Sequence, residues 1–250
     1  LVNTACVYSK TSTPSAPIIW DKKYNKGETK ALIVNSGNAN AHTGSKGLDI
    51  INSYVKYLSK KLNCKKNEIL VSSTGVIGEL FNPEIIINQI KKISKNKSSE
   101  IIEAAQTIMT TDTYPKLSNK KFILNRKKYN IFGIAKGSGM INPNMGTMLV
   151  YLFVEPYISK NNLKKLINDN LDNTFNAITV DSDTSTSDTL ALFSLDQSKI
   201  NLKTKKNFNI VSSAISEIMK DLSLQVIKDG EGLTKLIQVN IMRANSKNQA

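Results

Sequence analysis

The segment 137–155, GSGMINPNMGTMLVYLFVE, joins two kinds of sequence that seldom adjoin. Residues 148–154 form an apolar and aromatic run of the length of a buried strand, whereas the Gly, Ser, Asn and Pro residues before them favour neither helix nor strand. The junction is Gly146-Thr147, which places a small residue and a hydroxyl group at the entrance of a buried strand. We therefore take this strand as the centre of the expected fold.

The sequence around this strand alternates strands, glycine-rich loops and helices. Short apolar runs predict strands, and apolar residues at a spacing of three and four predict helices. The expected strands cover 31–35, 68–72, 148–154 and 236–241, with a hairpin over 121–135, and the expected helices cover 45–62, 82–93, 99–109, 159–171, 183–195 and 205–228. This alternation predicts a mixed α/β architecture.

The composition places limits on the class of protein. With 250 residues, 27.6 kDa and 40% hydrophobic residues, the chain can bury a sizeable core. No run approaches the ~20 apolar residues that span a bilayer, and residues 1–10 lack the pattern of a secretory signal. We therefore expect a cytoplasmic protein with no membrane partner. Because the chain begins at Leu1, we interpret it as processed or as a fragment.

The side chains best suited to metals and to acid–base chemistry are scarce. Cys6 and Cys64 have no metal-ligand spacing and fit a reducing compartment, and His42 is the only histidine. A multi-histidine metal site is thus excluded within this chain, and a nucleophile would have to find a base elsewhere. The segment VDSDTSTSD, with Asp181, Asp183 and Asp188, lacks the glycine and terminal glutamate of a calcium loop, so we expect no metal.

The net charge of +14 raises the question of nucleic acid. Only Arg126 and Arg243 are arginines, and the lysines are spread along the chain without interleaved aromatic residues. Base readers favour arginine, and stacking platforms need aromatic side chains. We therefore expect no nucleic-acid partner; a lysine-rich binding module remains an alternative that steeply salt-dependent binding would reveal.

Four loops that follow strands carry the residues suited to chemistry: SGNANAHTG, SSTGVIG, TTDT and KGSGMINPNMGT. Glycines there allow backbone N–H groups to face an anion or oxyanion, although each loop alone is equally a turn that needs positive φ. Thr147 stands where N-terminal nucleophile enzymes place their nucleophile. A break before it would free an α-amine with a pKa near ~8 to serve as its base; otherwise Thr147 is an ordinary β-branched strand residue.

Six blocks of the sequence resemble one family in order. GIAKGSGMINPNMGTML, LIVNSGNANAHTG, VSSTGVIG, MTTDTYPK, VDSDTSTSD and DGEGLTKLIQV together resemble the ornithine acetyltransferase (glutamate N-acetyltransferase) family of arginine biosynthesis. The resemblance implies a layered α-β-β-α sandwich similar to that of N-terminal nucleophile hydrolases. It also implies that family members continue beyond this chain at the C-terminus.

The resemblance implies a role for particular residues. Self-cleavage between Gly146 and Thr147 would divide an α part, 1–146, from a β part, 147–250, which completes the catalytic core and enters a smaller second domain. Thr147 would be the nucleophile, and Thr74 and Gly75 would form the oxyanion hole. The substrate-binding positions would be Thr113, Lys136, Glu231 and Thr147 itself. Apart from the resemblance, these side chains are equally typical of a turn hydroxyl, a solvated lysine and a surface acid.

The activity implied is acetyl transfer from N-acetylornithine to glutamate through an acetyl-threonine intermediate. Some family members also accept acetyl-CoA as the donor, and no other cofactor is implied. The two parts would remain together as a heterodimer and assemble into a heterotetramer. The alternatives are an N-terminal-threonine amidase or aminopeptidase, in which water is the acceptor, and an inactive fragment.

Three departures from the family pattern accompany the resemblance. Gly146 replaces the usual alanine before the nucleophile, and Ser182 and Ser187 stand where Gly and Asn are common. The family's last substrate-binding residues, an Asn and a Ser or Thr, have no counterpart before Ala250.

Overall fold

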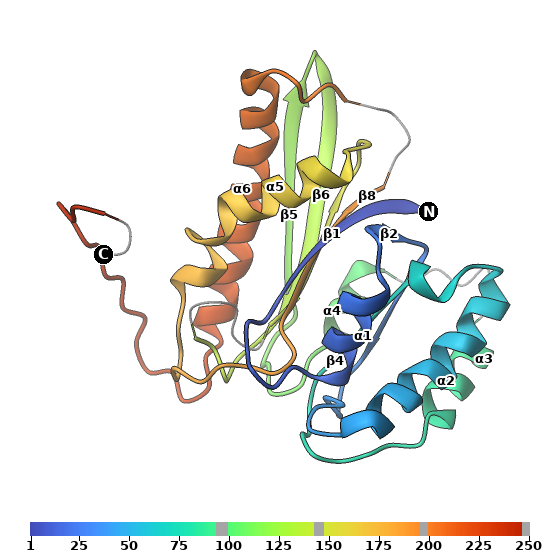
Figure 1. Ribbon diagram of the computed structural model, residues 1–250. Coiled ribbons are helices and arrows are strands. Elements are labelled where there is room, and N and C mark those ends of the chain that lie inside the picture. The colour runs from blue at the N-terminus through green and yellow to red at the C-terminus, as the bar shows by residue number, and fades with distance from the viewer. Residues whose placement is uncertain (94–99, 143–147, 196–199, 247–250) are drawn as a thin grey trace.

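The computed structural model describes residues 1–93, 100–142, 148–195 and 200–246 (Figure 1). Its larger sheet has six strands in the order β2-β1-β8-β7-β6-β5, and a smaller sheet pairs β3 with β4 in parallel. The strands are β1 Val2–Tyr8, β2 Glu28–Thr29, β3 Ala31–Asn35, β4 Ile69–Ser73, β5 Lys116–Leu124, β6 Lys127–Lys136, β7 Leu149–Val154 and β8 Thr189–Ser194. The helices are α1 Ala16–Tyr24, α2 Gly44–Leu62, α3 Glu84–Lys92, α4 Ile101–Thr107, α5 Lys160–Leu171 and α6 Lys205–Lys228, with short 3-10 helices at Lys66–Glu68 and Phe175–Ala177.

β7 lies inside the larger sheet, and its side chains alternate between two cores. Val150 and Leu152 belong to the core that also contains α5 and α6, whereas Leu149 and Tyr151 belong to a second core on the opposite face. Successive side chains of a strand point to opposite faces. The continuous apolar run of the sequence therefore buries both faces of the sheet.

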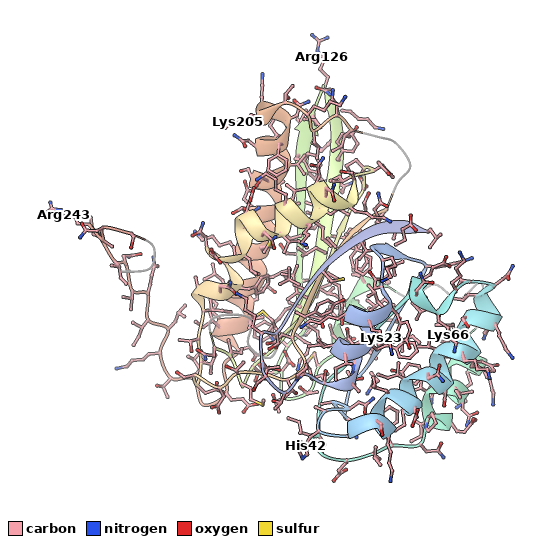
Figure 2. All side chains as sticks on the ribbon, viewed as in Figure 1. Lys23, His42, Lys66, Arg126, Lys205 and Arg243 are labelled. Atoms are coloured by element: carbon pink, nitrogen blue, oxygen red, sulfur yellow. The ribbon has the colours of Figure 1, made fainter. Side chains whose placement is uncertain are left out.

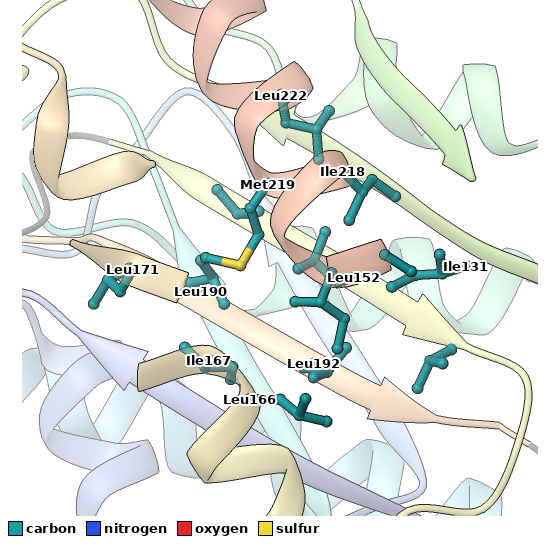
Figure 3. Packing of buried hydrophobic residues seen from close by; sticks show 14 of the residues in the cluster. Ile131, Leu152, Leu166, Ile167, Leu171, Leu190, Leu192, Ile218, Met219 and Leu222 are labelled. Atoms are coloured by element: carbon teal, nitrogen blue, oxygen red, sulfur yellow. The ribbon is translucent and has the colours of Figure 1, made fainter. Parts of the chain in front are cut away.

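The first of these cores packs the two helices α5 and α6 onto the sheet. Figure 3 shows its side chains interdigitating, with residues contributed by three strands and both helices: Ile131, Leu152, Leu190 and Leu192, Leu166, Ile167 and Leu171, and Ile218, Met219 and Leu222.

The smaller sheet lies on the other face of the larger one. Leu70 of β4 shares the second core with Leu149 and Tyr151, while Ile69 and Val71 pack in a third core with α1, α2 and α3. The layers are therefore helices, sheet, sheet and helices. This arrangement confirms the predicted α-β-β-α sandwich.

Most predicted elements are present within a few residues of the expected bounds. Those found are the strands over 31–35, 68–72 and 148–154, the hairpin over 121–135, and the helices over 45–62, 82–93, 99–109, 159–171 and 205–228. β1 and α1, at the start of the chain, were not anticipated.

The helix predicted over 183–195 is wrong. Residues Thr189–Ser194 form β8, which is buried along its whole length and pairs with β1 on one side and β7 on the other. The preceding Asp, Ser and Thr residues suit a helix start, but they suit an irregular turn equally well. Because a short apolar run fits either a strand or a buried helix, only pairing with neighbours distant in sequence decides between them.

The strand predicted over 236–241 is also wrong. These residues have no regular structure, and Ile237 and Val239 are 75% and 77% exposed. The alternating pattern is that of a strand, but no strand among the described residues pairs with this segment. Figure 1 shows it leading away from the body of the molecule toward the C-terminus.

The sheet combines strands from both sides of the predicted break at residue 146. β1 pairs antiparallel with β8, and β6 pairs antiparallel with β7.

Within the described ranges, no helix is long and apolar enough to cross a membrane.

Candidate active site

A cavity of about 840 Å³ opens where several glycine-rich loops meet. Four of the residues predicted to act in catalysis or substrate binding line it: Thr74, Gly75, Lys136 and Glu231. The other lining residues are Ser36, Gly37, Val76, Met109, Thr110, Thr111, Gly139, Met140, Asp181 and Asp183. The loops predicted from separate parts of the sequence thus form one cavity.

The loop after β4 brings Thr74 and Gly75 to this cavity. The Thr74 N–H donates to the Asn35 carbonyl at 3.0 Å, which extends the pairing of β3 and β4 by one residue. Gly75 has φ +125°, and a Cβ there would lie 2.3 Å from the carbonyl carbon of Gly37. Only glycine fits this backbone and this close approach.

Lys136, the last residue of β6, carries the buried cation of the cavity. It is 2% exposed, and its Nζ donates to the hydroxyls of Thr74 at 2.9 Å and Thr110 at 3.0 Å. Burial lowers the pKa of Lys136, and the carboxylates of Asp112, Asp188 and Glu231 oppose that shift. Because both acceptors are neutral hydroxyls, the ammonium retains the capacity to bind an anionic group.

A second buried lysine, Lys116, connects the loops around Lys136. Its Nζ lies 2.6 Å from both Asp112 Oδ1 and Asp229 Oδ2, and all three side chains are almost fully enclosed. Asp112 Oδ1 also accepts the N–H of Gly137 at 2.7 Å. One ammonium therefore holds together the loops that carry Thr110, Lys136 and Glu231.

Desolvation raises the pKa of Asp112, but hydrogen bonds from Lys116 and Gly137 and the charges of Lys136 and Lys116 outweigh it, so the net shift is downward. Asp112 is therefore held as a carboxylate.

Thr113 takes part in this supporting network rather than in the lining of the cavity. Its N–H donates to Asp229 Oδ2 at 2.9 Å, and its hydroxyl donates to Asp229 Oδ1. The residue of the TTDT loop that meets Lys136 is Thr110, which sequence reasoning missed. Nothing local in TTDT distinguishes Thr110 from Thr113, because the difference lies in which of them reaches Lys136 in the folded chain.

The lining of the cavity also includes acidic residues, Asp181, Asp183 and Glu231. Glu231 lies against Gly139, where an added Cβ would come within 2.8 Å of the Glu231 carboxylate. Asp181 accepts the N–H groups of Met140 at 2.5 Å and Ile141 at 3.0 Å, which fixes the loop that leads toward residue 143. A ligand that carries both an ammonium and a carboxylate group would therefore find groups of opposite charge to each among the lining residues.

A smaller cavity, which has no room for a water molecule, adjoins Lys136 and Thr74 at the entrance of β7. Its remaining lining residues are Met148, Leu149, Ser185, Ser187 and Asp188. Gly146 and Thr147 lie outside the described residues. The assignment of Thr147 as the nucleophile therefore remains a prediction. The described residue that follows it, Met148, borders this smaller cavity.

Among the described residues, the remaining metal-ligating side chains form no comparable site. His42 lines a different cavity of about 400 Å³ with Thr43 and Leu48, and the described part of the chain contains no group of three His, Cys, Asp or Glu residues arranged for a metal. Figure 2 shows Arg126 and Lys205 at one end of the molecule, Lys23 and Lys66 in another part, and Arg243 on the C-terminal segment. These labelled cations do not form one stripe.

The fold is that of the N-terminal nucleophile hydrolases. A structure of L-aminopeptidase D-Ala-esterase/amidase from Ochrobactrum anthropi, described as a variant of that fold, superposes with a TM-score of 0.54 at 10% identity and covers 92% of this chain and 73% of that one. At such low identity the similarity concerns the fold alone.

Within that fold, the family model of the ArgJ family matches residues 1–250, and the chain belongs to this family. The arginine biosynthesis bifunctional protein ArgJ of Bartonella henselae is 40% identical over 253 residues, covering 99% of this chain and 62% of the relative. A crystal structure of the protein of the same name from Bacillus halodurans has a TM-score of 0.52 and 34% identity, covering 56% of this chain and 74% of that chain. The chain thus spans about 62% of the length of that curated relative.

Proposed function

We propose that this chain carries the catalytic core of an acetyltransferase of arginine biosynthesis, which moves the acetyl group of N-acetylornithine to glutamate. The observation that carries the proposal is the cavity in which Lys136, Thr74, Gly75 and Glu231 converge. Membership of the ArgJ family supports the same activity. The assembly of the cleaved parts into a heterodimer and a heterotetramer, and acetyl-CoA as a second donor, belong to the same proposal; no other cofactor is needed.

The charges of the cavity suit the two substrates. N-acetylornithine offers a carboxylate and an ammonium group, and glutamate offers the same pair with a further carboxylate. Lys136 would bind a carboxylate, and Glu231 would bind an ammonium group. Thr74 and Gly75 would stabilise the oxyanion through the hydroxyl and the backbone N–H, a contribution of roughly 3 kcal/mol per donor.

The reaction comprises two acyl transfers on Thr147. Self-cleavage after Gly146 would free the α-amine of Thr147, which takes the hydroxyl proton as the oxygen attacks the acetyl carbon. The carbon–nitrogen bond to ornithine breaks, and the departing nitrogen takes the proton back. Glutamate then attacks the acetyl-threonine ester by the reverse sequence, so we expect ping-pong kinetics.

The first test is the intact mass of the full-length protein together with transfer of labelled acetyl from N-acetylornithine to glutamate. We expect two fragments, the second beginning at Thr147, and neither cleavage nor transfer in Thr147→Ala. Transfer at the wild-type rate in that variant would refute the nucleophile. Release of free ornithine and acetate without N-acetylglutamate would favour the amidase alternative instead.

Lys136→Ala provides the second test. We expect cleavage to proceed and kcat/KM to fall roughly 10- to 100-fold, because a charge-assisted contact with substrate is worth about 1.5–3 kcal/mol. Lys165→Ala, which removes an exposed lysine of α5, serves as the control. If both variants behave alike, Lys136 does not bind substrate.

A further inference from the structure

Thr110 lines the cavity of about 840 Å³ and has no role in the proposed reaction. It follows α4 and is the first residue of the TTDT loop. The Lys136 ammonium donates to its hydroxyl at 3.0 Å, as it does to the Thr74 hydroxyl at 2.9 Å. Both threonine hydroxyls therefore contact the same cation, and all three residues line the cavity.

The direction of these hydrogen bonds determines what the hydroxyls can still donate. An ammonium has three N–H donors and no acceptor, so each threonine oxygen must be the acceptor in its bond with Lys136. The hydroxyl proton of Thr110 is therefore not engaged by Lys136, and no residue of the described ranges accepts it. Lys136 also keeps one N–H beyond the two that bind the threonines. Thr110 and Lys136 can thus each donate one hydrogen bond to a ligand.

Asp112 holds these two donors in a fixed relation. Its Oδ2 accepts the N–H of Thr110 at 3.2 Å, and its Oδ1 accepts the N–H of Gly137, the residue after Lys136, at 2.7 Å. The carboxylate itself is buried and bound to Lys116 at 2.6 Å. The fold therefore sets the spacing of the hydroxyl and the ammonium before a ligand arrives, which lowers the entropic cost of binding.

The donors suit a carboxylate rather than an ammonium group. A carboxylate has two oxygens that only accept, and it would receive one hydrogen bond from Lys136 and one from Thr110. A ligand ammonium at the same place would meet Lys136 as a like charge and would compete for the oxygen that Lys136 already occupies.

We propose that Thr110 binds the α-carboxylate of the substrate together with Lys136, by donating its hydroxyl proton to one carboxylate oxygen. This inference rests on the proposed function, because it takes N-acetylornithine and glutamate as the ligands. Both carry an α-carboxylate, so the same pair of donors serves both halves of the reaction. Thr113, in the same loop, already donates its hydroxyl to Asp229.

The test is Thr110→Val in the full-length protein, with the dissociation constants of ornithine and ornithinamide measured by titration calorimetry. Valine keeps the branched shape and removes the hydroxyl. The Kd of ornithine should rise roughly 10-fold or more, whereas that of ornithinamide should rise by about 3-fold or less, because a hydrogen bond to a neutral amide is weaker than one to a carboxylate. Thr110→Ser, which restores a hydroxyl, should bind ornithine nearly as the wild type does.

The kinetics should show the same selectivity. Thr110 contacts a part of the substrate that does not react, so Thr110→Val should raise KM for N-acetylornithine and leave kcat nearly unchanged. A fall in kcat with an unchanged KM would refute a role in binding.

Thr107→Val is a matched control from the same segment. Thr107 is the last residue of α4, its hydroxyl donates to the Glu103 carbonyl at 2.7 Å, and it lines neither of the cavities that contain Lys136. Both dissociation constants should remain those of the wild type. Thr113→Val provides a second comparison: if it weakens ornithine selectively while Thr110→Val does not, the carboxylate is bound by Thr113 and the inference is wrong.

The outcomes separate this inference from the proposed function. If the wild-type protein binds ornithine and transfers acetyl, but Thr110→Val changes the two dissociation constants equally or not at all, the role of Thr110 is refuted and the function stands. A wild-type protein that neither binds ornithine nor transfers acetyl would refute the function itself. If Thr110→Val does not fold, Thr110→Ala removes the same hydroxyl from this exposed position, and the same selective loss of ornithine binding is required of it.

Discussion

Two buried carboxyl groups in different loops act on Lys136, and their pKa values are shifted in opposite directions. Asp112 is paired with Lys116 at 2.6 Å, and its pKa is lowered; Asp188 has no ion pair among the described residues, and its pKa is raised. Both are almost fully enclosed, with 8% and 0% exposure. Burial alone therefore does not determine the charge of a carboxyl group in this site, because the partner decides it.

The two regions differ in whether their buried carboxyl groups have ion-pair partners among the described residues. Each charged group of the Lys116 network has an ion-pair partner within the described chain, so the network can act as a rigid support. Asp188, by contrast, is a buried acid with no ion-pair partner among the described residues. Variants that remove a partner in the first region or the acid in the second test this difference.

The largest effect is expected for Lys116→Met, which leaves Asp112 and Asp229 without their cation. Removing one partner of a buried ion pair costs about 3–5 kcal/mol. Urea unfolding of the variant should show a loss in this range. A loss under about 1 kcal/mol would mean that the network does not support the loops.

Asp112→Asn should have a smaller effect, since Lys116 keeps Asp229. We expect a loss of about 1.5–3 kcal/mol at neutral pH, the value of a hydrogen bond to a charged group. The folded-state pKa of Asp112 is lowered, so its contribution is present above the unfolded pKa near ~3.9 and is lost as pH falls through the folded value. The difference between wild type and variant should therefore shrink in acid; a constant difference from pH 7 to pH 3 would contradict the assignment.

Asp188→Asn should have the opposite sign when cleavage is blocked by Thr147→Ala. The folded-state pKa of Asp188 is raised, so stability is fully present below the unfolded pKa near ~3.9 and is lost as pH rises toward the folded value. Replacing the acid by a neutral amide removes this loss, and the doubly substituted protein should gain on the order of 1 kcal/mol at neutral pH. Equal stability curves for the two proteins between pH 4 and pH 7 would show that Asp188 is not an unpaired acid.

The smallest effect is expected for Lys165→Met, which matches Lys116→Met in geometry. Lys165 and Asp169 form a pair with the same 2.6 Å distance and the same four-residue spacing, but the two side chains are 58% and 39% exposed. Exposed pairs contribute roughly 0.2–1 kcal/mol. Losses of similar size in the two methionine variants would remove burial as the cause of the difference.

Individual strands and helices were predictable where the sequence was locally decisive, whereas the layered sandwich was expected only from the family resemblance. The apolar run over 148–154 follows residues that favour neither helix nor strand, and β7 lies where it was expected. The run Thr189–Ser194 has the same length and burial, yet it follows residues that suit a helix start. Its strand conformation is determined by β1 and β7, which are remote in sequence, so no local pattern contained the answer.

The candidate site was predictable only through resemblance to a family. Lys136 and Thr74 are 62 residues apart, and nothing in either segment indicates that they meet. The same holds for Thr110, which lies beside Lys136, and for Thr113, which binds Asp229. Asp188 was interpreted as part of a helix start because its hydrogen bond to Met148 N–H depends on two segments brought together by folding.

The order of strands in the larger sheet has a consequence for assembly. β7 and β8 lie side by side between β1 and β6, so a cut between residues 142 and 148 leaves each piece contributing strands to the other's sheet. To separate, the pieces would have to break two antiparallel interfaces and open the core at once, which makes dissociation a form of unfolding. Joined pieces fold as one chain, whereas pieces made separately would meet only by a second-order reaction whose yield depends on their concentration.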